Sequence, residues 1–199
     1  MATSKTEVAN LALFKIGQNP ITSLTEGSKA SVLINTIFNQ CLGVVLERYA
    51  WSFATKRAAC AKLDVTLAWG DEDVYQLPSN YLRLVELNNQ WVVGDGRLLG
   101  GNEKAYTIEG NTMLNSMGSA NIRYVAFEDN IELYPPTFVD ALAAYIAKEI
   151  AKPITGDSND RLRAEELFNI SIKTAKMTQA IQLPPASLPD TSILTNREY

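Results

Sequence analysis

Apolar residues recur at helical spacing in two stretches near the beginning of the chain. Ser4 and Glu7 have the spacing of a capping box, which predicts a helix that begins at Ser4 and ends at Gly17. A second helix is expected from Ser28 to about Tyr49. The apolar faces predicted for these helices are Val8, Leu11, Ala12 and Ile16 in the first, and Val32, Ile37, Cys41, Leu42 and Val45 in the second.

The middle of the chain has the alternation and the turn residues of short strands. Trp51 and Phe53 alternate with small residues, so this segment is expected to be extended, with both rings on one side. We interpret the two rings as the core of a hinge between a helical and a β part. Seven of the eleven glycines lie between Gly70 and Gly118, among aromatic and β-branched residues. Strand candidates are residues 74–77, 81–87, 91–93, 97–99, 105–108, 112–114 and 122–127.

Helical periodicity returns near Pro136. The helix that begins there is expected to be kinked or ended by Pro153. A last helix, from about Asn159 to Gln182, has an apolar face wider than one partner requires, which indicates packing against a neighbouring subunit. The residues expected on this subunit-packing helix are Leu167, Ile170, Met177 and Ile181.

The final segment, residues 183–199, contains three of the eight prolines and cannot be helical near them. Two interpretations stay open, a disordered tail and an extended arm that orders on a partner. The arm is favoured by its apolar residues, which would anchor it on a partner. These anchors are Leu183, Leu188, Ile193, Leu194 and Tyr199.

Together these elements predict an α+β fold: a helical bundle of about four helices, an inserted small antiparallel β region and an extended C-terminal arm. The helical bundle would comprise residues 1–57 and 131–182, and the β region residues 58–130. The arm would comprise residues 183–199.

Composition removes most enzyme classes. The 199 residues include no histidine, which excludes Ser-His-Asp and Cys-His triads and imidazole metal sites. Cys41 and Cys60 form no CxxC pair, and no phosphate-binding glycine loop is present. The densest carboxylate group, Asp71, Glu72 and Asp73, is expected to be a solvated loop, because adjacent side chains point in different directions. We therefore expect no catalytic residues, no cofactor and no metal.

Charge and hydropathy bear on whether the protein binds DNA and on whether it enters a membrane. The net charge of −4 argues against a protein that reads duplex DNA through a basic surface. Residues 58–130 carry ten acidic and five basic side chains, and a neutral or acidic wall suits a channel through which DNA slides. The N-terminus lacks the apolar core of a signal peptide, and the uncharged run at residues 30–46 is too short and too polar to span a bilayer. We expect a soluble protein that is made in the cytoplasm and has no membrane partner.

Several stretches, in this order and spacing, resemble the head–tail adaptor family of tailed bacteriophages, the group called tail tubular protein A. The resemblance covers most of residues 5–181. The matching stretches are Glu7 to Leu13 with Ile16 and Gly17, Ile21 with Ser23 and Leu24, Arg48 to Ala54 with Arg57, Tyr75 to Arg83, Phe138 to Ala143, Ile150 with Ala151, and Ile154 to Gly156.

The resemblance implies a structural virion protein without enzymatic activity. Twelve copies would form a connector ring in the neck of the phage, assembled in the host cytoplasm, between the portal protein and the tail nozzle or tube. Genomic DNA would pass through the lumen during ejection without sequence-specific binding. The implied fold is a helical bundle with an inserted β region, and the terminal arm with its anchor residues would dock on the portal protein or a neighbouring subunit.

Three alternatives remain. A carbohydrate hydrolase carried on the tail would need two carboxylates that converge in a cleft. A nucleic-acid-binding protein would need a basic face, for example Lys56, Arg57, Lys148 and Lys152. Another structural component of a tail tube or baseplate would differ from an adaptor in its symmetry and its position in the particle.

Overall fold

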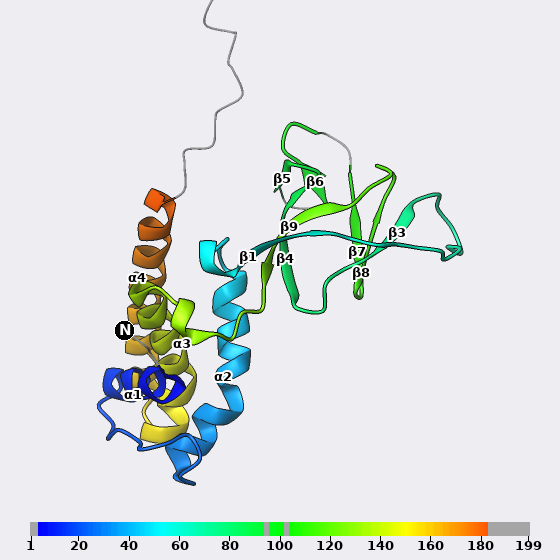
Figure 1. Ribbon diagram of the computed structural model, residues 1–199. Coiled ribbons are helices and arrows are strands. Elements are labelled where there is room, and N and C mark those ends of the chain that lie inside the picture. The colour runs from blue at the N-terminus through cyan, green and yellow to red at the C-terminus, as the bar shows by residue number, and fades with distance from the viewer. Residues whose placement is uncertain (1–3, 94–95, 102–103, 183–199) are drawn as a thin grey trace, which may run out of the picture.

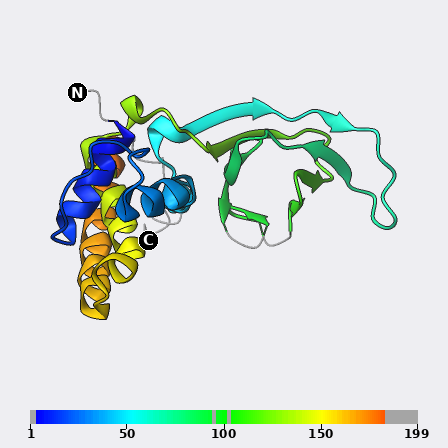
Figure 2. The ribbon, with the colours of Figure 1, turned by 90° about the horizontal axis from the view of Figure 1, so that it is seen from below.

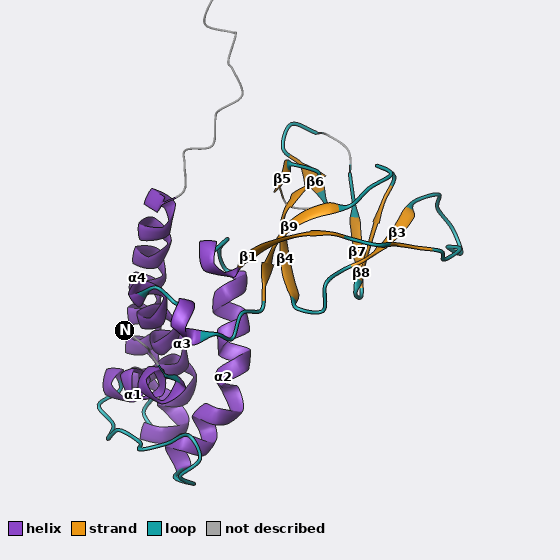
Figure 3. Cartoon of the chain, in the orientation of Figure 1, coloured by secondary structure: helices purple, strands orange, loops and turns teal. Residues whose placement is uncertain are grey.

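The protein consists of a helical part and a β part that lie side by side (Figure 1). The computed structural model describes residues 4–93, 96–101 and 104–182. The helical part contains the helices α1 (Lys5–Lys15), α2 (Lys29–Glu47), α3 (Pro136–Thr155) and α4 (Ser158–Gln182), with the short 3-10 turns η1 (Ser52–Ala54) and η2 (Ile131–Leu133). Figure 3 shows how completely the helices are separated from the strands.

The start of α1 is fixed by the predicted capping box. The Glu7 backbone N–H donates to Ser4 Oγ at 3.1 Å, and the Ser4 N–H donates to Glu7 Oε2 at 2.9 Å. The predicted apolar face is wrong at Leu11, which is exposed, as is Phe14 with 80 % of its surface accessible. The buried positions are instead Val8, Ala9, Ala12, Leu13 and Ile16.

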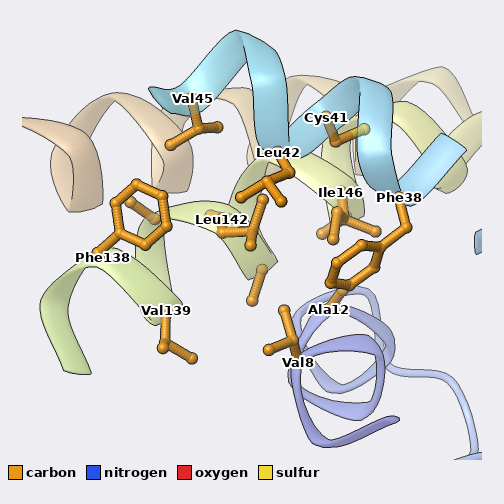
Figure 4. Packing of buried hydrophobic residues seen from close by; sticks show 14 of the residues in the cluster. Val8, Ala12, Phe38, Cys41, Leu42, Val45, Phe138, Val139, Leu142 and Ile146 are labelled. Atoms are coloured by element: carbon orange, nitrogen blue, oxygen red, sulfur yellow. The ribbon is translucent and has the colours of Figure 1, made fainter. Parts of the chain in front are cut away.

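Helix α2 is apolar because most of one side is packed inside the fold. Its buried residues include Ile34, Phe38, Leu42 and Val45, whereas Val32, predicted on the same face, is exposed. The helix has the length and the mean hydropathy, 1.3, of a membrane span. Packing against α3 accounts for that composition (Figure 4).

Helix α3 is the centre of the helical part and contacts α1, α2 and α4. Five of its buried residues are alanines, whose small side chains let neighbouring helices approach closely: Ala141, Ala143, Ala144, Ala147 and Ala151. Pro153 does not end the helix, which continues to Thr155. The end is set by Gly156, whose backbone has φ +77° and whose N–H bonds to the Lys152 carbonyl at 3.0 Å.

The β part is larger than the sequence predicts. It contains two antiparallel sheets, with strand order β1-β9-β4-β5-β6 in one and β2-β3-β8-β7 in the other. Figure 2 shows both sheets beside the helices. The strands are β1 (Thr55–Ala59), β2 (Lys62–Leu63), β3 (Asp73–Gln76), β4 (Tyr81–Leu87), β5 (Gln90–Val93), β6 (Arg97–Leu98), β7 (Thr107–Glu109), β8 (Thr112–Asn115) and β9 (Asn121–Ala126).

The predicted fold class, a helical bundle with a small β insert, is therefore wrong. The described residues form an α+β fold with nine strands and a substantial sheet component. The β part has its own apolar core, to which both sheets contribute: Tyr75, Leu77, Leu84, Leu87, Leu98, Met113, Ala120, Ile122, Tyr124 and Ala126. A single hairpin cannot form a core of this size, so the β part is a packed unit with a core of its own.

The two parts share side chains where they meet. Val85 of β4 and Val125 of β9 belong to the core of the helical part. Trp51 also lies in this core, 1 % exposed, and its indole N–H donates to the Val45 carbonyl at 3.1 Å. Ser52–Ala54 is a 3-10 turn, so the predicted extended conformation of this segment is wrong.

Candidate interaction surfaces

The carboxylates singled out from the sequence lie at the start of β3 and just before it. Asp71 and Glu72 are exposed ahead of β3, while Asp73 lies in β3 and pairs with Lys62 at 2.5 Å. Within the described residues, no group of three or more histidine, cysteine, aspartate or glutamate side chains is placed to hold a metal ion.

The outer face of α4 carries the four residues predicted to pack against another subunit. Leu167, Ile170, Met177 and Ile181 are all exposed, Ile170 at 64 % and Ile181 at 85 %. With the exposed Thr174 between them they follow a spacing of 3, 4, 3 and 4 residues, which places them in one row along the helix. We call this row the α4 outer row.

The opposite face of α4 packs inside the protein. Ala164, Phe168, Ile172 and Ala175 are buried in the helical core. The aromatic ring of Phe168 lies 4.9 Å from that of Tyr145, centroid to centroid. The apolar residues of the α4 outer row are therefore additional to those that α4 buries in the helical core. Its role in subunit packing stays a prediction.

A second apolar surface, which the sequence analysis missed, lies between α1 and the start of α3. Leu11, Phe14, Pro20 and Val139 line a groove of about 1110 Å³, together with Tyr134 and polar residues. Leu11 was assigned to the buried face of α1, and this error concealed the groove. The exposed pair Leu11 and Phe14, three residues apart on one helix, is the pattern that could have indicated it.

Three carboxylates also border this groove, but two of them are engaged elsewhere. Glu7 accepts the bond of the α1 capping box, and Asp140 accepts bonds from Lys15 Nζ at 2.6 Å and Ser171 Oγ at 2.5 Å. Burial acts to raise the pKa of Asp140, but these two donors outweigh it and hold the pKa below its ordinary value. A general acid needs the opposite shift, so the groove gives a hydrolase no suitable proton donor in Asp140.

The basic residues named for nucleic-acid binding do not act as one positive face. Lys56 pairs with Glu128 at 2.9 Å, and Lys148 pairs with Glu165 at 3.1 Å. Arg57 is exposed on β1, and Lys152 is exposed on α3. Two of the four charges are thus neutralised, which weakens the electrostatic attraction that such a protein needs.

The remaining residues singled out in the sequence either pack inside the fold or lie outside the described residues. Trp51 and Phe53 pack on Phe138 at centroid distances of 5.0 and 4.8 Å, where the helical part adjoins the β part. Cys41 is a buried core residue, and burial first, then the charge of Glu149, raise the pKa of its thiol to about 12. The arm anchors Leu183, Leu188, Ile193, Leu194 and Tyr199 lie outside the described residues.

Comparisons with known proteins add no relative: no protein-family model matches the chain, and no curated protein matches it at a significant level. Any functional conclusion therefore rests on the surfaces described above.

Proposed function

We propose that the protein is a non-enzymatic structural component of a phage tail, an adaptor ring that joins the portal protein to the tail nozzle or tube and surrounds the DNA exit channel. The observation that carries the proposal is the α4 outer row. Taking one large apolar side chain fully out of water contributes about 1.5–3 kcal/mol, so four such residues in a row favour a protein neighbour.

The row has the geometry of a helix–helix contact rather than of a ligand pocket. Residues spaced by 3 and 4 positions form a narrow seam that a second helix can cover. A further copy of this chain supplies a helix of suitable length, since α4 contains 25 residues. In a ring, one face of each copy would cover the α4 outer row of the next.

The test is the molar mass of the full-length chain in solution, alone and with the portal protein of the same phage. We expect a large ring in at least one of the two conditions. The double variant Ile170→Lys/Met177→Lys should lose ring formation while it keeps its helical circular-dichroism spectrum. Val65→Lys, which changes an exposed apolar residue of the β2–β3 loop, is the matched control and should still assemble.

Different outcomes separate the alternatives. A chain that forms rings but does not bind the portal protein would point to another tail tube or baseplate component. A chain that stays monomeric with and without the portal protein would contradict the proposal. So would a double variant that assembles as well as the unaltered chain, because the α4 outer row would then not be the contact.

A further inference from the structure

The groove between α1 and the start of α3 has a size that suits a helix rather than a small molecule. Its volume of about 1110 Å³ exceeds the range of about 300–1,000 Å³ that is usual for small-molecule pockets. Leu11 and Phe14, both exposed, form one wall, and Pro136 and Val139 form the other. Large apolar side chains that stay exposed beside a hollow indicate a surface for a protein partner.

The α4 outer row has the shape that such a groove accepts. Its residues, from Leu167 to Ile181, stand at positions i, i+3, i+7, i+10 and i+14. This is the spacing with which an amphipathic helix lays its apolar side into a groove. The row is a ridge and the groove is a hollow, and large apolar side chains are exposed on both. One chain therefore carries two surfaces of complementary shape.

One copy cannot place its own row in its own groove. The buried residues Phe168 and Ile172 hold α4 in the helical core through the face opposite to the row. Helices α1 and α4 each pack against α3, so α4 would have to leave α3 in order to reach the groove. The groove therefore needs the α4 of another copy.

The charges beside the two surfaces are complementary as well. Glu7 and Glu132 border the groove, and neither forms an ion pair within the described part of the chain. Arg163 lies in line with the row, one turn before its first residue, and its ion pair within α4 is long, at 3.7 Å. The exposed Lys173 lies beside the row, as does one acidic residue, Glu166. Contact between row and groove is therefore attractive, whereas contact between two rows brings cations together.

We propose that the α4 outer row of one copy lies in the groove between α1 and α3 of the next copy. This inference rests on the proposed function, because it names the surface that receives the row in the ring. The contact joins two different surfaces, so each copy in a growing assembly still offers a row or a groove to a further copy. Such contacts close into a ring when the rotation between neighbours divides a full turn. Contact between two rows would instead stop at a dimer.

The first experiment places a charge in the groove. Phe14→Lys changes an exposed side chain, so the variant should keep the circular-dichroism spectrum and the unfolding midpoint of the unaltered chain. We expect it to lose assembly, measured as molar mass in solution, in the condition in which the unaltered chain forms a ring. Val65→Lys, an exposed apolar residue changed in the same way, should still assemble. Full assembly of Phe14→Lys would overturn this inference and leave the proposed function standing.

The second experiment mixes two variants that each keep one half of the contact. Phe14→Lys keeps the row, and Ile170→Lys/Met177→Lys keeps the groove. In the same condition each variant alone should stay a monomer. The mixture should form particles that contain one chain of each variant and no larger ring, because such a pair has used its intact row and its intact groove.

Two results of the mixing experiment would overturn the inference. The first is a mixture that stays monomeric, and the second is a Phe14→Lys chain that forms dimers by itself, which would show that row packs on row. A ring of the unaltered chain would support the proposed function in either case. A chain that never assembles, with or without the portal protein, would remove both.

Discussion

Trp51 provides the most direct test of how the helical core is built. The indole ring is 1 % exposed and lies 5.0 Å from the ring of Phe138 and 5.3 Å from that of Tyr49, centroid to centroid. Trp51→Ala leaves a cavity among these rings and removes the indole N–H that donates to the Val45 carbonyl. Substitutions of this kind lower the free energy of unfolding by about 3–5 kcal/mol.

A smaller change separates the two contributions. Trp51→Phe keeps an aromatic ring but removes the indole N–H, so it should cost about 1–3 kcal/mol, the range for leaving a buried hydrogen-bonding group unsatisfied. Both variants are compared with the unaltered chain by urea unfolding, followed by circular dichroism at 222 nm, which reports mainly on the helices. Domains of ordinary stability unfold with about 5–15 kcal/mol, so either loss is readily measured.

The chain contains its own control for this experiment. Trp69 is 86 % exposed in the loop between β2 and β3, so Trp69→Ala is the same substitution without a cavity. It should change the free energy of unfolding by less than about 0.5 kcal/mol. A loss below about 1 kcal/mol for Trp51→Ala, or equal losses for the two alanine variants, would refute the packing argument.

Three further predictions follow from the buried and paired groups. The hydrogen bonds from Lys15 and Ser171 outweigh burial and lower the pKa of Asp140. The stability that Asp140 contributes is therefore present above its unfolded-state pKa and is lost as the pH falls through its folded-state pKa. Asp140→Asn should therefore flatten the decline of the thermal midpoint below about pH 4. Cys41 should resist a thiol reagent at pH 8 until the protein unfolds, whereas the half-buried Cys60 should react in the folded state, as mass spectrometry of labelled peptides would show. Glu86→Gln removes the partner of Arg123 on the sheet and should cost about 1–3 kcal/mol in urea unfolding, and an unchanged midpoint would contradict this.

The sequence predicts features that depend on neighbouring residues. Ser4 and Glu7 determine the start of α1 because the capping box is closed within one turn. Asn88 and Asn89, which lie between the strand candidates 81–87 and 91–93, form the turn between β4 and β5, where both have positive φ, +48° and +66°, as a two-residue hairpin turn requires. The exposed residues of the α4 outer row could be chosen from spacing alone.

The errors come from features that depend on distant residues. Whether Leu11 or Leu13 faces the core depends on where α3 lies, and an α-helix pattern with apolar residues on several sides leaves this open. Pro153 is tolerated because it lies in the last turn of α3, where one lost backbone hydrogen bond matters least. The size of the β part was underestimated because two strands were not among the candidates. The β1 strand lies directly after the helical segment, and β2 contains only two residues, too few to show alternation.

The groove beside Leu11 could not be found from the sequence. One of its walls comes from α1 and the other from the start of α3, which are far apart along the chain, so it exists only once the helices are packed.

The pairing of β1 with β9 has a consequence for how such a chain can change. The backbone leaves the helical part at Thr55 and returns to it after Ala126, and Thr55 lies opposite Val125 in the ladder. Antiparallel partners have their Cα atoms about 4.5–5.5 Å apart, so the whole excursion begins and ends at nearly the same point. A different β module can therefore be spliced in there, provided that it supplies apolar residues in place of Val85 and Val125 in the core of the helical part. The same helical part can thus be combined with different β parts.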